Sequence, residues 1–235
     1  MSYIVADRLT KTFGTGASGV QAVSDISFRI APGEFVAIMG ESGAGKSTLL
    51  GILGAMNAPS SGRLVVDDID LYRLHSEQLA DFRREYLGFV FQSFHLVQYL
   101  SVIENVMLPL TVTRRSNTQK RAMALEALSR VGLSEKADRL PGEISGGEKE
   151  RVAVARAIVN EPPILLADEP TGNLDSRNSR EIMQMFQGLN DGGMTIIMVT
   201  HSTECAASAR RIMQVSDGRL LENRSAQEAA IRMAS

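Results

Sequence analysis

The sequence predicts an α/β protein with a mostly parallel sheet, an N-terminal antiparallel β subdomain and an inserted helical subdomain. Three short apolar runs, at residues 34–39, 164–168 and 195–200, are typical of buried strands in a parallel sheet. Residues 24–30 instead alternate between apolar and polar, which indicates a half-buried antiparallel strand. From about residue 93 to residue 160 the pattern is helical, so we expect this stretch to interrupt the core.

Turn residues separate the expected elements of the N-terminal half. Two strands, at residues 3–9 and 24–30, flank a glycine-rich loop at residues 14–19. After the Pro32-Gly33 turn and the strand at 34–39, the remaining expected elements are a helix at 47–56, a strand at 63–66, an acidic turn at 67–70, a charged helix at 77–84 and a strand at 87–91.

Helix-capping patterns organise the second half. Ser101 and Ser145 are each followed three residues later by glutamate, which is the form of a capping box. The other expected elements are helices at 119–131 and 176–190, strands at 164–168 and 195–200, a hairpin of 212–215 with 219–221 around Asp217-Gly218, and a frayed helix in the tail at 223–235. We therefore expect one domain over residues 1–222, with the helical subdomain at about 93–160 inserted in it.

Composition narrows the classes of function. The 235 residues are 44% apolar, and their net charge of −2 gives no electrostatic reason to expect a nucleic-acid partner. The single cysteine, Cys205, excludes an internal disulfide, and three histidines disfavour a structural zinc site. Because the sequence lacks both a bilayer-spanning apolar run and a signal peptide, we expect a cytoplasmic protein that acts at a membrane through another chain.

A glycine-rich run fills every fixed position of the phosphate-binding pattern G-x-x-x-x-G-K-[ST]. Its residues are Gly40, Glu41, Ser42, Gly43, Ala44, Gly45, Lys46, Ser47 and Thr48. The glycines let backbone N–H groups point at phosphate oxygens, Lys46 supplies charge, and the Ser47 hydroxyl is a hard ligand for Mg²⁺. The apolar strand before the run and the helix after it disfavour the alternative, a turn that binds nothing.

Polar residues also follow the other core strands. Asp168 is expected to hold Mg²⁺, and Glu169 to polarise an attacking water. His201 is expected at the γ-phosphate or at the glutamate, and Gln92 at Mg²⁺ or the water. Alone, His201 and Gln92 are weak evidence, and two acids can simply cap a strand. Together they indicate one site, because ligands of parallel sheets bind at the carboxyl ends of the strands.

A second anion site is predicted at the start of the helix after Ser145. Ser145, Gly146 and Gly147 expose N–H groups at a helix N-terminus. Taken alone, Ser145 with Glu148 is an ordinary helix cap. A chain with one phosphate loop gains little from a second γ-phosphate site in its own insert, so we expect this one to complete the pocket of another copy.

In these motifs and their order the chain resembles the ATP-binding cassette (ABC) ATPases, which have a P-loop NTPase core. The phosphate loop corresponds to Walker A, Asp168 to Walker B, residues 144–148 to the signature, Gln92 to the Q-loop, residues 173–175 with Asp175 to the D-loop, and His201 to the H-loop. The resemblance implies a head-to-tail dimer that holds two ATP and Mg²⁺ between the Walker A of one copy and the signature of the other. It also implies that Phe13 stacks on adenine, although a core role for Phe13 is the alternative.

Residues 170–175 and 104–110 resemble the branch that serves lipoprotein release, macrolide-type export and cell division. This implies an integral membrane permease as partner, at the cytoplasmic face of the inner membrane, with residues 92–100 and 139–143 at the coupling surface. The signature departs from Leu-Ser-Gly-Gly-Gln at Ile144, which should be benign, and at Glu148, which adds negative charge near the partner copy's nucleotide.

Two other functions fit parts of the sequence. A soluble ABC-type protein acting on nucleic acid or ribosomes is disfavoured by the single cassette, the absence of long heptads and the slight net acidity. A small-molecule kinase shares the phosphate loop but leaves His201 and the second anion site unexplained.

Overall fold

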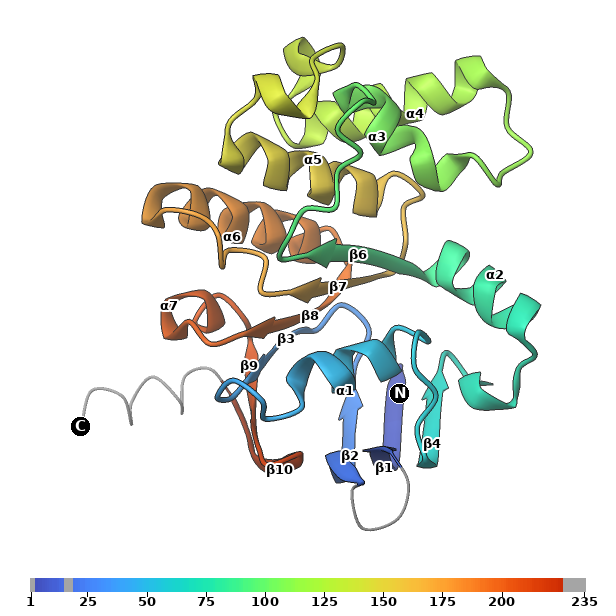
Figure 1. Ribbon diagram of the computed structural model, residues 1–235, viewed down its shortest axis with the longest axis vertical. Helices are drawn as coiled ribbons and strands as arrows, with labels where there is room; N and C mark the ends of the chain where they lie inside the picture. The colour runs from blue at the N-terminus through green and yellow to red at the C-terminus, as the bar shows by residue number, and fades with distance from the viewer. Residues whose placement is uncertain (1–2, 15–18, 226–235) are drawn as a thin grey trace.

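The computed structural model describes residues 3–14 and 19–225, which form two sheets and the helices around them (Figure 1). The strands are β1 (Ile4–Phe13), β2 (Val20–Ile30), β3 (Phe35–Met39), β4 (Ser61–Val66), β5 (Ile69–Asp70), β6 (Leu87–Phe91), β7 (Ile164–Asp168), β8 (Thr195–Thr200), β9 (Arg211–Ser216) and β10 (Arg219–Ser225). The α-helices are α1 (Lys46–Leu53), α2 (Ser76–Tyr86), α3 (Val102–Met107), α4 (Asn117–Arg130), α5 (Gly146–Ile158), α6 (Ser176–Asp191) and α7 (Thr203–Ala206).

The larger sheet has six strands in the order β10-β9-β3-β8-β7-β6. Strand β3 pairs in parallel with β8 and β9, and β7 pairs in parallel with β6 and β8, whereas β10 alone runs antiparallel. The smaller sheet, in the order β2-β1-β4-β5, is antiparallel. The predicted fold class is therefore confirmed, and the carboxyl ends of β3, β6, β7 and β8 meet at one edge of the larger sheet.

The apolar strands are buried because each face of the larger sheet is covered. In β3, Phe35, Ala37 and Met39 pack in a core shared with α3 to α6, while Val36 and Ile38 pack in a second core shared with α1 and the antiparallel sheet. Figure 1 shows α5 and α6 on one side of the sheet and α1 on the other. A strand with two covered faces reads as a continuous apolar run, which explains the sequence pattern.

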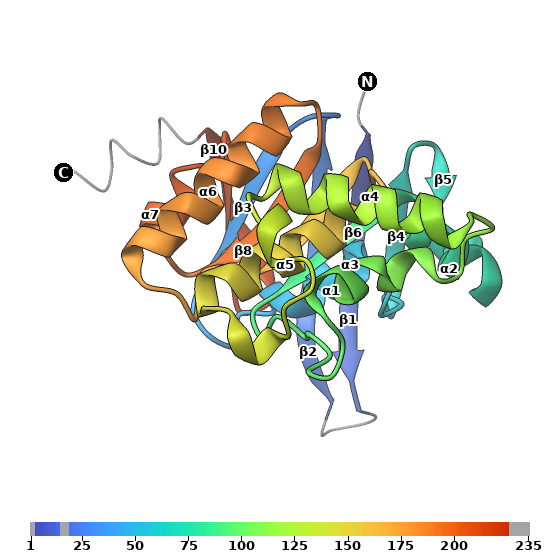
Figure 2. The ribbon, with the colours of Figure 1, turned by 90° about the horizontal axis from the view of Figure 1, so that it is seen from above.

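The stretch between β6 and β7 contains α3, α4 and α5 and, throughout its described length, no strand. Viewed from above, these helices lie over the larger sheet (Figure 2). The Ser101 hydroxyl accepts the Glu104 N–H, and the Glu104 carboxylate accepts the Ser101 N–H at 2.7 Å, so the predicted capping box begins α3. The same box begins α5 at Ser145.

Several local expectations differ from the structure. Strands β1 and β2 extend beyond the predicted segments until Phe13 pairs with Val20, so Phe13 belongs to a strand. Asp67 and Asp68 form the acidic turn in the left-handed region, but Ile69 already pairs with Val66 in β5.

The expected tail helix is wrong for residues 223–225, because the β9–β10 ladder continues through them and Asn223 pairs with Met213. Residues 226–235 lie outside the described part of the chain. In the described ranges, no helix has the length and apolar character needed to cross a membrane.

Candidate nucleotide site

The phosphate-binding pattern forms a tight loop between β3 and α1. Gly45 precedes α1 with a φ of 95°, and a side chain there would collide with the Ala22 carbonyl of β2, so the position requires glycine. The Lys46 side chain turns back over the loop and donates to the carbonyls of Gly40 and Glu41 at 2.8 and 2.9 Å. Lys46 is only 8% exposed, so its charge is held at the floor of the loop.

Ser47, in the first turn of α1, is joined to the end of β7. Its hydroxyl donates to Asp168 Oδ1 at 3.1 Å. Burial is the main influence on Asp168 and raises its pKa, while the hydrogen bond from Ser47 acts in the opposite direction. A half-buried carboxylate beside a hydroxyl is a pair of hard oxygen donors that a divalent cation would stabilise.

Glu169 and His201 form a pair across the ends of β7 and β8. His201 Nδ1 lies 2.9 Å from Glu169 Oε1, and the His201 backbone N–H donates to Oε2 at 3.4 Å. Because an ionised carboxylate only accepts, Nδ1 carries the proton in this contact. Glu169 has a left-handed φ of 49°, which is uncommon for a residue other than glycine and directs its side chain to the histidine.

Gln92 follows β6 and is fixed by the segment after Glu169. The Gln92 carbonyl accepts the Asn173 side-chain amide at 2.8 Å. A side chain at Gly172 would approach Gln92 Nε2 to 2.9 Å, so this glycine leaves room for the glutamine amide. The strand ends of β6 and β7 are thereby tied together.

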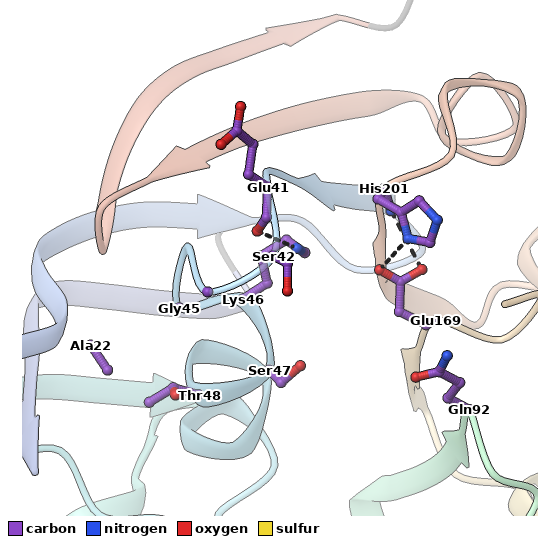
Figure 3. Close-up of a pocket in the computed structure, with 11 residues that line it drawn as sticks. Ala22, Glu41, Ser42, Gly45, Lys46, Ser47, Thr48, Gln92, Glu169 and His201 are labelled. Carbon is purple, nitrogen blue, oxygen red and sulfur yellow. Dashed lines mark hydrogen bonds and ion pairs between the residues drawn. The ribbon is translucent and has the colours of Figure 1, made fainter.

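These groups surround a cleft of about 690 Å³. In Figure 3, Gln92, Glu169 and His201 lie across from Lys46 and Ser47. The lining consists of Ala22, Glu41, Ser42, Gly43, Gly45, Lys46, Ser47, Thr48, Gln92, Glu169 and His201. All but Ala22 belong to the predicted site; Ala22 enters because β2 packs against the loop, a contact between sheets that local sequence does not signal.

Several predicted site residues do not line this cleft. Gly40 and Ala44 belong to the same loop behind it, and Asp168 reaches it through Ser47. Phe13 lies outside it, 46% exposed, with Lys11 Nζ 5.2 Å from the centre of its ring. The remaining predicted residues outside it are Ser145, Gly146, Gly147, Glu148 and Asp175.

The start of α5 is satisfied by its own cap. The Ser145 hydroxyl accepts the Glu148 N–H at 3.3 Å, and Glu148 Oε2 accepts the Ser145 N–H at 2.7 Å. This backbone hydrogen bond is the largest influence on Glu148 and lowers its pKa, and Lys136 Nζ lies 3.7 Å from the other carboxylate oxygen. The carboxylate of Glu148, which distinguishes this signature, is therefore bonded at the start of its own helix.

Asp175 caps the start of α6 in the same way. Its carboxylate accepts the Asn178 backbone N–H at 2.8 Å and the Asn178 side-chain amide at 2.7 Å. The cap connects the segment after Glu169 to the helix that packs beside α5 (Figure 1).

The family model described as "ABC transporter" matches residues 23–172. The chain is 42% identical to the "Uncharacterized ABC transporter ATP-binding protein YvrO" of Bacillus subtilis, over 93% of this chain and 95% of that protein. The chain belongs to the ABC transporter family. It is an ATPase of the P-loop NTPase fold.

Two further relatives extend the comparison. The chain is 45% identical to the "Macrolide export ATP-binding/permease protein MacB" of Burkholderia pseudomallei over 92% of its own length, but it spans only 33% of that protein. A solved structure of the ATP-binding cassette MJ0796, dimeric and bound to ADP and Pi in a post-hydrolysis state, has a TM-score of 0.87 at 39% identity. The match covers 95% of this chain and 98% of that cassette.

Proposed function

We propose that this ABC ATPase is a nucleotide-binding subunit whose two copies close head to tail around two Mg-ATP and drive a membrane permease. The observation that carries the proposal is the assembled cleft. Lys46, Ser47, Glu169 and His201 come from three strand ends and are already bonded to their neighbours, while the second anion site lies elsewhere on the chain.

Lys46, Ser47 and Asp168 are the groups we assign to the phosphates and the cation. Serine hydroxyl, carboxylate and the Gln92 amide are all oxygen donors, which fits Mg²⁺, and the cation would supply neutralising charge at the β- and γ-phosphates. Lys46 would exchange its two carbonyl acceptors for phosphate oxygens, so the loop holds in advance the charge that the nucleotide needs.

Glu169 is the group we assign to the attacking water. Its carboxylate is 14% exposed and lies at the cleft, so Oε2, which accepts only the longer bond from the His201 backbone, can accept a proton from water while the His201 ring orients Oε1. His201 is 68% exposed and is thus positioned between Glu169 and the open side of the cleft, where a γ-phosphate would also be within its reach.

The second half of each site is assigned to another copy. Ser145 and Gly146 are exposed at the start of α5, and neither lines the cleft of their own chain. A helix N-terminus attracts anions, so this end would meet the γ-phosphate bound by the partner copy. The dimeric state of the MJ0796 cassette, 39% identical to this chain, supports the arrangement.

A groove between β6, α2 and α5 is the surface we assign to the permease. It has a volume of about 530 Å³ and includes Phe91, His95, Val112 and Arg156. Its apolar and basic lining includes Phe91, the residue before Gln92, and His95, three residues after it, so a docked permease segment would contact both sides of Gln92 in the chain. The similarity to MacB, which is an ATP-binding/permease protein, supports such a partner, and we therefore assign this subunit to the cytoplasmic face of the inner membrane at the bacterial envelope.

Substituting Glu169→Gln tests the proposal. We expect ATP binding to persist while phosphate release falls to background and a dimer accumulates with ATP on a sizing column, because the isosteric amide cannot accept the proton. Glu126→Gln, an exposed glutamate on α4, is the matched control and should keep wild-type turnover. Full steady-state turnover in Glu169→Gln would overturn the assignment of Glu169.

A further inference from the structure

Two adjacent glycines at the start of α5 have different surroundings. Around Gly146 there is open space within 4 Å of the position a side chain would occupy, and the residue is exposed. Gly147 is buried, and a methyl group there would collide with the side-chain oxygen of Asn178. The second glycine is therefore required by a contact inside this chain, whatever it meets in a partner.

Asn178 contacts two motifs at once. Its side-chain oxygen lies against Gly147, while its side-chain amide and backbone N–H both bind the Asp175 carboxylate, at 2.7 and 2.8 Å. Three polar groups of this one residue, in the first turn of α6, are thus divided between the signature helix and the aspartate that caps α6.

The segment that ends at Asp175 begins at Glu169. The Gly172 N–H donates to the Glu169 carbonyl at 3.0 Å, and the Leu174 N–H donates to the Thr171 carbonyl at 3.1 Å. Asn173 in the same segment holds the Gln92 carbonyl. These successive turns make a short, hydrogen-bonded connection from the candidate water-activating residue to Asp175.

We propose that Asn178 is a positioning residue that packs against Gly147 and fixes the start of α5 relative to Asp175. The anion site at the start of α5, which faces the partner copy, then moves together with Glu169 and Gln92 of the same chain. The proposal rests on the head-to-tail dimer proposed above. In that dimer the start of α5 faces one nucleotide and Glu169 faces the other, so Asn178 links the two nucleotide sites within each chain.

A second contact between the same helices provides a control. Arg151 of α5 forms an ion pair with Glu181 of α6 at 2.8 Å, about one helical turn beyond Gly147 on α5 and beyond Asn178 on α6. Loss of this ion pair loosens the two helices without creating space beside the glycine.

The test is suppression of one substitution by another, measured as ATP turnover and as nucleotide affinity of the full chain. We expect Gly147→Ala to lower kcat about 10–100-fold, because the methyl displaces Asn178. Asn178→Ala should lower kcat about 3–10-fold while the affinity for ATP stays within about twofold, because the Walker A loop is untouched. In the double variant, only the Cβ at position 178, 3.3 Å from the site of the added methyl, remains, and kcat should return to the Asn178→Ala level.

The control and the conservative variant separate positioning from general packing. Gly147→Ala with Glu181→Gln should remain as slow as Gly147→Ala. Asn178→Asp preserves shape but places a carboxylate against Asp175, so its kcat should fall below that of Asn178→Ala even though aspartate suits the first turn of a helix. A melting temperature near that of the wild type verifies that each variant is folded.

The outcomes distinguish this inference from the proposed function. If the wild-type chain neither dimerises with ATP nor hydrolyses it, the proposed function fails. If the wild type is active but adding Asn178→Ala leaves Gly147→Ala as slow as before, the methyl group is obstructing the partner copy or its nucleotide, and the role of Asn178 is overturned.

Discussion

The two anion-facing regions of the chain are built in opposite ways. In the Walker A cleft, Ser47 is bonded to Asp168, 121 positions away in the sequence, and Glu169 is bonded to His201 across a neighbouring strand. At the start of α5, Ser145 and Glu148 are bonded to each other within one helical turn. The first region is assembled by the sheet, while the second is capped within one helical turn and, in the proposed dimer, would be completed by another copy.

This difference predicts which substitutions prevent ATP binding and which prevent only the closure of the dimer. Lys46→Ala has the largest expected effect, because it removes the charge at the floor of the cleft. We expect ATP affinity and phosphate release both to fall about 10²–10³-fold. A fluorescent nucleotide titration and a phosphate-release assay measure the two quantities, with Lys120→Ala on α4 as a control. Unchanged nucleotide affinity in Lys46→Ala would contradict the assignment of this loop.

Ser145→Arg addresses the other region. We expect turnover to fall about 100-fold or more, because a bulky cation at the start of α5 blocks the approach of a second copy, while ATP affinity stays within about twofold. Ser145→Ala removes the cap without adding bulk and should cost about 1 kcal/mol of stability. A monomer of Ser145→Arg with normal turnover would show that the chain needs no partner copy.

The sequence predicts which residues line the cleft better than it predicts which of them contact one another. Gly45, Lys46 and Ser47 have fixed spacing in one loop, and an apolar run that ends in Asp168 has few other interpretations. Local pattern carries no information on which distant groups touch, so the pairing of Glu169 with His201 was only one of two stated options. Ala22 and the contact of Asn178 with Gly147 were not anticipated, because both arise where separate elements pack.

The tail prediction failed because strand pairing outweighs local helix propensity. The Ala-rich tail favours helix locally, but pairing with β9 decides the state of residues 223–225. Glu148 is a different case: its capping box follows from the sequence pattern, whereas the contact with Lys136, which lies in a separate segment, does not. The effect of its charge on a partner copy stays a prediction.

His201→Ala tests the contact between Glu169 and His201 in the cleft, and its expected effect is smaller than those above. Loss of one hydrogen bond to the Glu169 carboxylate should lower kcat about 10–100-fold and leave ATP affinity within about twofold. His75→Ala, at the exposed start of α2, is the control. If kcat in His201→Ala equals that of the wild type, the pair does not orient the water-activating group.

The smallest expected effect concerns Glu150, two residues beyond the capped Glu148. In the described residues neither Glu150 oxygen has a hydrogen-bond partner, and nearby Arg156 donates instead to the carbonyls of Phe94 and His95. Burial raises the pKa of Glu150 from 4.5 to about 8, and Arg156 opposes this shift. The folded chain thus retains a proton that the unfolded chain releases, so its stability should fall as pH rises from about 4.5 through about 8.

Glu150→Gln removes this titration, so the variant should match the wild type near pH 5 and exceed it by about 1–3 kcal/mol at pH 8.5. Denaturant unfolding without nucleotide at the two pH values measures the difference. Glu148→Gln is the control: because its capping hydrogen bond lowers the pKa of Glu148 from 4.5, the stability it contributes is present at both pH values and is lost only as pH falls through the folded pKa, so this variant should differ from the wild type by the same amount at pH 5 and pH 8.5. Two carboxylates on one helix would then differ in their response to pH, because the helix cap holds one and the other has no hydrogen-bond partner in the described residues. The same dependence on pH in both variants would contradict that distinction.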